Sequence, residues 1–302
     1  MRILLYVLMQ IAVLVVVSIV GSIILSLLGI QLDGASYSGL LIMCAVFGCV
    51  GSLISLFASK MMCKKAYRVR TLVSPTNAKE AFLLQIVSEL AQRSGFNMPE
   101  VGIYESNDLN AFATGYNKNA ALVAVSSGLL YSMNENEIKG VLGHEMTHVA
   151  NGDMVTMALL QGVLNTFVYF FSYVVSMAIS VAMSGRNSDD DNSSSSGIGN
   201  PFMFYMVNSV CQVLFGILAN IILMWFSRWR EYRADAGSAR LEGKFCMIEA
   251  LEALKRGTAV HTNKETQFSA FCISGPSGLA ELFMSHPPLE KRIAALQALA
   301  TF

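Results

Sequence analysis

The segment His-Glu-Met-Thr-His at residues 144–148 places two imidazoles and a carboxylate within little more than one turn of a predicted helix. His144 and His148 are four residues apart, so both side chains project from one helix face and can share a tetrahedral cation. Glu145 lies near the same face and can reach a water molecule beside that cation. The pattern is typical of a hydrolytic zinc site, and two surface histidines on an amphipathic helix are the alternative.

A catalytic zinc usually has three protein ligands and one open position. The only other histidines are His261 and His286. A better third ligand is Glu231, in the segment "SRWREYRADAG", and Asp235 lies one turn further along the same face. Asp235 could accept the free ring N–H of a histidine ligand and so fix its tautomer. The alternative is an ordinary helix in which both acids pair with neighbouring arginines.

The rest of the chain is unusually apolar. Of its 302 residues 54% are hydrophobic and 14% are charged, whereas soluble domains have about 25% charged residues. Four apolar runs, at 4–30, 39–59, 154–183 and 204–226, approach or exceed the ~20 residues that span a bilayer. The first is too long for the apolar core of a signal peptide, so it is predicted to be an uncleaved membrane helix.

The distribution of basic residues predicts the orientation of these runs. Lysines and arginines follow the second run and the fourth run, at Lys60, Lys64, Lys65, Arg68, Arg70, Arg228, Arg230 and Arg233. The loop at 184–203 has one arginine against three aspartates. Because cytoplasmic loops carry the excess of Lys and Arg, both termini and the soluble segments are predicted to be cytoplasmic.

The third and fourth runs form a predicted hairpin that returns Glu231 to the level of the two histidines. Within it, Gln161 and Asn220 are predicted to face each other, since polar side chains in lipid tend to bond across helices. Four parts are therefore predicted. These are a membrane hairpin at 1–60, the first part of a soluble domain with the histidine helix at 61–153, a second hairpin at 154–226, and the remainder of the soluble domain at 227–302.

The soluble parts are predicted to combine helices with a few short strands. A helical pattern covers 76–95, and the runs "EVGIYES" (100–106) and "ALVAVSSGLL" (121–130) are β-like. Ser132 and Glu135 have the spacing of a capping box, which predicts the start of the histidine helix.

Four motifs in this order resemble the HtpX family: "NAFATG" (110–115), "HEMTHVANGDMVTM" (144–157), "REYRADAGSA" (230–239) and "SHPPLEKRI" (285–293). Members of that family are membrane zinc endopeptidases of bacterial stress response and quality control, related to the CAAX prenyl proteases. The resemblance covers essentially the whole chain. It implies a mainly α fold with a small β-sheet, in which a gluzincin-type metallopeptidase domain stands on a four-helix transmembrane anchor in the bacterial inner membrane, with its site facing the cytoplasm.

The resemblance also implies roles for individual residues. His144, His148 and Glu231 would hold one zinc ion, and Glu145 would be the catalytic base. His286 and Arg292 would lie across the cleft and could stabilise an oxyanion, although His286 could be a lone surface histidine. Two further positions, Asn110 and Ala111, would begin a cleft-edge strand that binds an extended peptide through its main chain; a plain structural hairpin is the alternative.

The predicted partners are protein substrates, damaged or misfolded membrane proteins above all, and the lipid bilayer. A formal net charge of zero gives no argument for a nucleic-acid partner. The rival from another class is a membrane scaffold or chaperone with a structural zinc, but such sites usually fill all four positions with protein ligands. A transporter is a weaker rival, because no charged residue interrupts the apolar runs.

Overall fold

The structure is a computed structural model that describes residues 34–184, 201–262 and 284–299, with the single positions 15, 19, 23 and 26. Most of the first apolar run and most of the 184–203 loop lie outside these residues, as do His261's side chain and its surroundings. The chain separates into two compact units. One holds the chain up to Ile54 together with Ala158–Leu223, and the other holds Ser55–Met157 together with Met224–Phe302.

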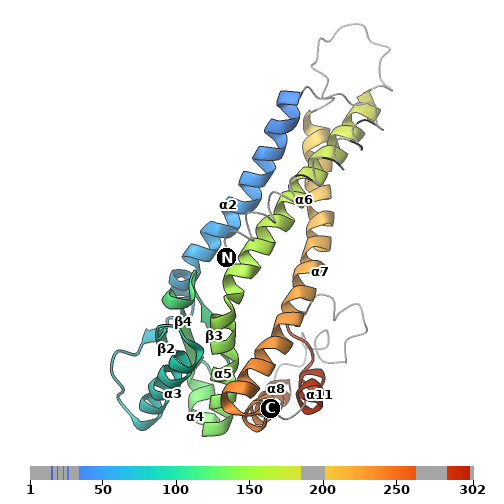
Figure 1. The fold of residues 1–302 in the computed structure, drawn as a ribbon. Coiled ribbons are helices and arrows are strands. Elements are labelled where there is room, and N and C mark those ends of the chain that lie inside the picture. Colours follow the sequence, from blue (N-terminus) through green and yellow to red (C-terminus); the bar gives the residue numbers. More distant parts are fainter. Residues whose placement is uncertain are drawn as a thin grey trace. The chain divides into compact units, whose positions relative to one another are not determined.

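Among the described residues, three helices provide the apolar segments, as labelled in Figure 1: α2 (Gly34–Ala66), α6 (Asp153–Ser184) and α7 (Pro201–Glu242). In the described part of the chain, three stretches are long and apolar enough to cross a membrane: Ser38–Ala66, Asp153–Met183 and Pro201–Glu242. They correspond to the second, third and fourth runs predicted from the sequence. Each of the three helices contributes residues to both units.

Within the unit that holds Ala158–Leu223, small residues let helices approach and some polar side chains bond within their own helix. A Cβ added to Gly48 would lie 2.5 Å from Oγ1 of Thr166, so α2 and α6 approach closely there. Gln161 donates to Oδ1 of Asn165 at 2.8 Å. The predicted pairing of Gln161 with Asn220 was wrong, because a partner one turn along the same helix meets the amide's hydrogen-bonding need without an interhelical contact.

The other unit contains a four-stranded mixed sheet with the order β1-β2-β4-β3. The central strands β2 (Glu100–Tyr104) and β4 (Leu122–Ser126) are parallel, with Val101 opposite Val123. They confirm the first β-like run and the first half of the second, whose last four residues, 127–130, are helical. The outer strands β1 (Arg70–Thr71) and β3 (Ala111–Thr114) pair antiparallel with them. Strand β3 therefore forms one edge of the sheet.

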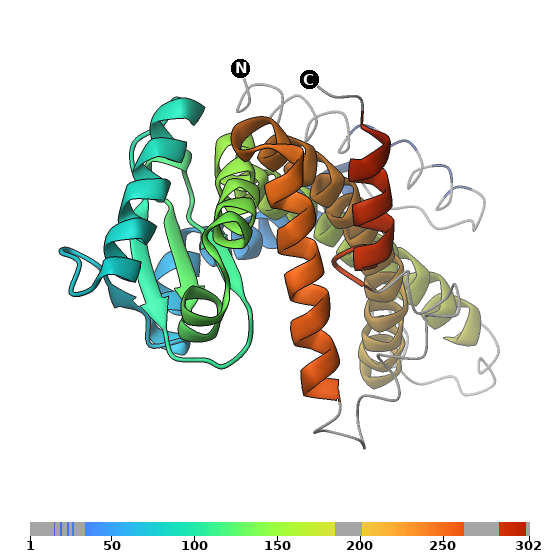
Figure 2. The same cartoon turned by 90° about the horizontal axis from the view of Figure 1, so that it is seen from below.

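Helices complete this unit: α3 (Ala78–Ser94), the 3₁₀ turn η1 (Lys118–Ala120), α4 (Ser127–Ser132), α5 (Glu135–Asn151), α8 (Lys244–Thr262) and α11 (Leu289–Ala298). Of the last three, α5 packs against the sheet, α8 packs on α5, and α11 packs on α8. The helix α3 fits the helical pattern predicted at 76–95, and it lies against the strands in Figures 1 and 2. One apolar core joins α3, the strands and α5, with Leu83, Val123, Leu142 and Met146 fully buried. This core fixes α5, the helix that carries the histidines.

The start of α5 differs from the sequence prediction. Ser132 is the last residue of α4, and the N-cap of α5 is Asn134. The Asn134 side chain accepts from the Glu137 amide at 3.0 Å, and Glu137 accepts from the Asn134 amide at 2.9 Å. The capping box is therefore real but two residues later than predicted, because a second pair with the same spacing overlaps the first.

Candidate metal centre

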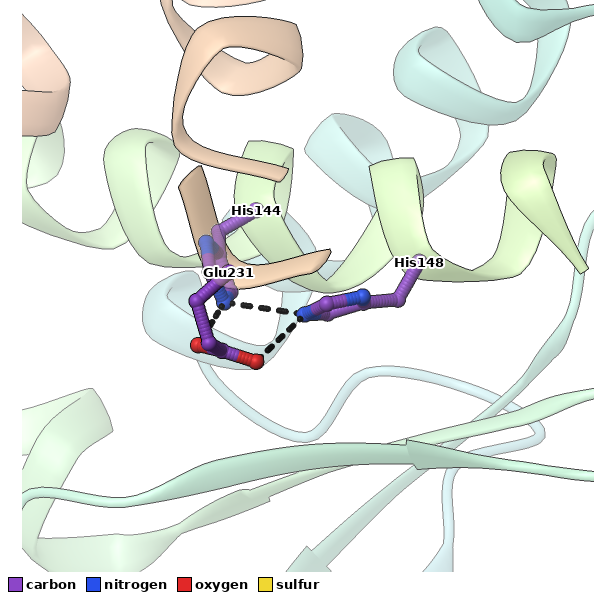
Figure 3. Close-up of side chains that lie close together, drawn as sticks. All are labelled: His144, His148 and Glu231. Atoms are coloured by element: carbon purple, nitrogen blue, oxygen red, sulfur yellow. Dashed lines mark hydrogen bonds and ion pairs between the residues drawn. The ribbon is translucent and has the colours of Figure 1, made fainter. Parts of the chain in front are cut away.

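Three side chains from two helices point toward one another in Figure 3: His144 and His148 from α5, and Glu231 from α7. The Nε2 atoms of the two histidines are 3.1 Å apart. Glu231 places Oε2 3.3 Å from Nε2 of His144 and Oε1 3.3 Å from Nε2 of His148. The three predicted ligands therefore meet in space, although α6 and the first part of α7 separate them in the chain.

This donor set fits a zinc ion. Zinc bonds of about 2.0–2.2 Å at tetrahedral angles put neighbouring ligand atoms about 3.3–3.6 Å apart. The two Nε2 atoms are 3.1 Å apart, and each lies 3.3 Å from a different oxygen of the Glu231 carboxylate. Two imidazole nitrogens and one carboxylate are also a usual donor set for hydrolytic zinc. With three protein ligands, one tetrahedral position is left for a water molecule or a substrate.

Close packing of α5 on α7 sets the distance between the histidines and the glutamate. A Cβ added to Gly237 would lie 2.3 Å from Cγ2 of Thr147, so only glycine allows this approach. The next residue of α7, Ser238, donates to the Gly140 carbonyl at 2.8 Å, two turns from Thr147 on α5. Both contacts are buried. They hold the two helices in one register, so Glu231 is presented at the level of His144 and His148.

A buried chain of hydrogen bonds orients His144. Its Nδ1 lies 2.9 Å from Oδ1 of Asp235, which leaves Nε2 free to bind metal. Asp235 in turn accepts two hydrogen bonds from Arg292 of α11, at 2.8 Å from Nε and 2.6 Å from Nη2. Asp235 and Arg292 are 2% and 5% exposed. The carboxylate is therefore fixed from both sides, and the histidine ring with it.

His148 has a matching partner that the sequence reasoning did not identify. Oδ2 of Asp153, the first residue of α6, lies 2.6 Å from Nδ1 of His148. Between them Gly152 adopts a left-handed conformation (φ 65°) that ends α5 and turns the chain into α6. The Arg230 side chain donates to the Asp153 carbonyl at 3.2 Å. Both histidines therefore turn Nε2 toward Glu231 and have Nδ1 against a buried aspartate, the arrangement that a metal ligand needs.

The carboxylates dominate the electrostatics of the site. Burial opposes protonation of His148, but the hydrogen bonds to Asp153 and Glu231 outweigh it and raise its pKa to about 9. Burial likewise opposes protonation of His144, and Asp235 and Glu231 raise its pKa above the ordinary value. Such a site attracts positive charge strongly, and a metal ion competes with protons for both imidazoles.

Comparison with known proteins gives the chain's relationships. The sequence model of peptidase family M48 matches residues 77–300. The protease HtpX of Tolumonas auensis is 51% identical over 297 residues, which are 98% of each chain. The protease HtpX of Pasteurella multocida is 52% identical over 305 residues, covering 100% of this chain and 99% of the relative. The chain belongs to the HtpX proteases of peptidase family M48.

A solved structure agrees with this M48 assignment at the level of the fold. The crystal structure of S. mikatae Ste24p matches with a TM-score of 0.62 over 97% of this chain and 67% of Ste24p, at 19% sequence identity. That identity is low enough for the likeness to concern the fold alone. The M48 fold described here is mainly helical, with a small mixed sheet beside the His-His-Glu group.

Two further residues predicted for the M48 site also lie near the ligands. Glu145 follows His144 in α5, is partly exposed, and its charge acts on His148. His286 is 62% exposed, and its Nδ1 lies 2.8 Å from Oε2 of Glu231. The structure thus brings His286 against a predicted ligand at the surface of the site. The catalytic roles of both residues stay predictions.

Arg292 lies beside the three clustered side chains, and its predicted role in oxyanion stabilisation stays a prediction. Its guanidinium is buried, bound to Asp235 and 3.5 Å from Oε2 of Glu231 through Nη1. The hydrogen bonds favour a positioning role through Asp235 and His144. Nothing in the sequence reveals this, because the contact depends on how α11 packs.

The predicted edge strand is present. Ala111 begins β3, Asn110 directly precedes it, and β3 is an outer strand of the sheet. Helix α5 packs against β3, so one edge of the sheet lies beside the histidine helix. Peptide binding along this edge stays a prediction.

Proposed function

We propose that this chain is a zinc-dependent membrane endopeptidase. One observation carries the proposal. Two Nε2 atoms and a carboxylate lie within 3.1–3.3 Å of one another, and each histidine is oriented by a buried aspartate. Membership of peptidase family M48 supports peptide hydrolysis as the reaction. A zinc ion bound there would polarise the scissile carbonyl and acidify water.

The side chains of the chain supply the proton transfers. Glu145 is in the turn between the two histidines and is partly exposed, so its carboxylate can take a proton from the attacking water. It then gives that proton to the leaving amine nitrogen. His286, at the exposed side of Glu231, can donate to the oxygen of the tetrahedral intermediate. Arg292 holds Asp235, which holds His144 in the productive tautomer.

We further propose where the reaction takes place. The apolar segments and the HtpX relatives support an inner-membrane protein. Lys60, Lys64 and Lys65 end the apolar part of α2, and Arg228 follows that of α7. This basic excess supports a cytoplasmic site on the division predicted from the sequence, with the peptidase domain built from 61–153 and 227–302 on a four-helix anchor.

Substrates of such a site are proposed to be unfolded or damaged membrane proteins, because cytoplasmic loops close to the bilayer would reach it. An extended segment would add to the free edge of β3 next to Asn110 and Ala111, through main-chain hydrogen bonds. Binding through the main chain depends little on the side chains of the substrate. A role in quality control is consistent with it.

Zinc content and cleavage rate, measured together in the purified full-length protein, separate an enzyme from a scaffold with structural zinc. The protein is prepared in detergent with a chelator, zinc is restored, and cleavage of an unfolded test protein is followed. We expect Glu145→Gln to keep its zinc and lose cleavage, because the amide cannot accept the proton. Glu135→Gln, the same change at the exposed start of α5, is the matched control and should behave like the parent.

Two further variants test the assigned roles. Glu231→Ala leaves two protein ligands, so its zinc content should fall. His286→Ala should keep zinc and slow turnover by roughly 10²–10³-fold, the usual loss for one oxyanion donor. If Glu145→Gln cleaves as fast as the parent, Glu145 is not the catalytic base; if the zinc-loaded parent does not cleave, the scaffold with structural zinc takes the place of the enzyme.

A further inference from the structure

A surface hollow of about 590 Å³ lies at the end of α2, within the unit that holds the metal centre. Its volume is within the range of ligand pockets, about 300–1,000 Å³. Six residues line it: Phe57, Lys60, Met61, Lys64, Lys65 and Tyr116. Five come from one face of α2, at helical spacing, and Tyr116 comes from the loop that follows β3. The lining thus combines three ammonium groups with two aromatic rings and a methionine.

The ammonium groups are partly fixed in place. Glu100, at the start of β2, pairs with Lys60 at 2.9 Å and also with Lys64. Burial raises the pKa of this carboxylate, but hydrogen bonds from both lysines and from Thr71 outweigh burial and lower the pKa, so Glu100 carries its negative charge. One carboxylate against three lysines leaves two net positive charges. In the described part of the chain no ion pair is recorded for Lys65, which is exposed.

Apolar side chains at the same place are exposed. Phe57 and Met61 are 62% and 69% exposed, and Tyr116 is 44% exposed. The rings of Phe57 and Tyr116 lie with centroids 5.3 Å apart. Exposed rings beside lysines, at the end of a membrane-length apolar helix, are the features of the headgroup level of a bilayer. Here they surround a hollow and do not form a simple belt.

We propose that this hollow binds the headgroup of an anionic phospholipid, with its phosphate against the lysines and its first acyl carbons against Phe57 and Met61. The charge of the hollow and its continuity with the apolar part of α2 select this occupant. A zwitterionic lipid offers the same chains but no net charge to the lysines. A free phosphate offers the charge but nothing to the apolar wall.

Lipid retention by the full-length protein tests the proposal. Purified protein in nonionic detergent is titrated with a short-chain phosphatidylglycerol, with phosphatidylcholine of the same chains, and with inorganic phosphate as a competitor; bound lipid is counted by native mass spectrometry. We expect phosphatidylglycerol to be retained preferentially and inorganic phosphate to displace it poorly. Because a lysine near an anionic surface contributes about a fivefold change in affinity, Lys65→Gln should weaken retention about fivefold.

Matched variants separate charge from fold. Lys65→Arg should bind like the parent, and Lys291→Gln, on exposed α11 surface outside the hollow, should change nothing. Tyr116→Ala should weaken the retention of both lipids, because it removes part of the apolar wall. Equal retention of the two lipids, parent-like binding by Lys65→Gln, or complete displacement by inorganic phosphate would each overturn the proposal.

Discussion

The pairing of Asp153 with His148 gives the sharpest prediction, because the contact was found from the structure and not from the motif. Asp153→Asn keeps an oxygen that can accept from Nδ1–H but removes the charge. A charge-assisted hydrogen bond contributes about 1.5–3 kcal/mol and a neutral one about 1 kcal/mol. The 2.6 Å contact should therefore lose roughly 0.5–2 kcal/mol. We expect zinc affinity to fall about 2- to 30-fold.

Removing the acceptor entirely should cost more. Asp153→Ala leaves the ring N–H of His148 without its partner in a site where Asp153 is 6% exposed. Loss of such partners typically lowers metal affinity 10- to 100-fold, and we expect the upper part of that range. The order parent, Asp153→Asn, Asp153→Ala is thus itself part of the prediction.

The assay is competition for zinc with a chromophoric chelator, at neutral pH in detergent. Asp153 is also the first residue of α6, where a carboxylate stabilises the helix by about 0.3–1 kcal/mol. That contribution is present with or without metal, so it alters thermal unfolding of the chelated protein but cancels in the zinc affinity. Glu135→Gln, which removes the same charge at the start of α5, is the control. If Asp153→Ala binds zinc as tightly as the parent, the carboxylate does not position His148 and the reasoning fails.

Three further perturbations follow from the geometry. Gly237→Ala would place a Cβ 2.3 Å from Cγ2 of Thr147, so α5 should shift. We expect the free energy of unfolding to fall by about 1–3 kcal/mol and zinc to bind more weakly. Unchanged thermal unfolding would contradict the close approach of the two helices. Arg292→Lys cannot form both of the hydrogen bonds that Nε and Nη2 of Arg292 donate to Asp235, so zinc affinity should fall about tenfold in the chelator assay. Parent-like affinity would show that Arg292 does not position Asp235. Although burial raises the pKa of Glu100, bonds to its lysines and a threonine hold it at about 2, below the ordinary 4.5. The ionised Glu100 therefore stabilises the folded state fully above about pH 5, and this stabilisation is lost as the pH falls toward 2. Glu100→Gln should reduce the change in unfolding free energy over this pH range by ~1 kcal/mol. Identical pH dependence in parent and variant would show that the ion pairs contribute nothing.

The grouping of His144, His148 and Glu231 could be predicted from the sequence because each part of the pattern is local. The spacing of His144 and His148 depends only on helix geometry. Glu231 and Asp235 have the same spacing on α7, and the apolar hairpin between the two pairs indicates that the chain returns. The strands β2 and β4 also follow from short-range pattern.

Contacts that depend on packing could not be predicted in this way. Asp153 reaches His148 because Gly152 takes a left-handed conformation, and "NGD" after the motif is a usable signal for such a turn. The position of Arg292 depends on how α11 packs near Asp235, which no periodicity encodes. The two-residue strand β1 carries too little sequence to form a pattern. The capping box was displaced because two candidate pairs overlap.

The division of the ligand set between α5 and α7 has a consequence for biosynthesis. Glu231 lies 83 positions after His148 in the chain, and a ribosome adds about 5–20 residues per second. For roughly 4–17 s after the histidine motif is made, the nascent chain therefore holds two of its three ligands, while α6 and α7 are still being inserted. Two imidazoles alone bind a metal ion more weakly than two imidazoles and a carboxylate. Under the proposed function, hydrolytic capacity begins only after Glu231 has been made, so the order of synthesis itself delays activity until the second hairpin is complete.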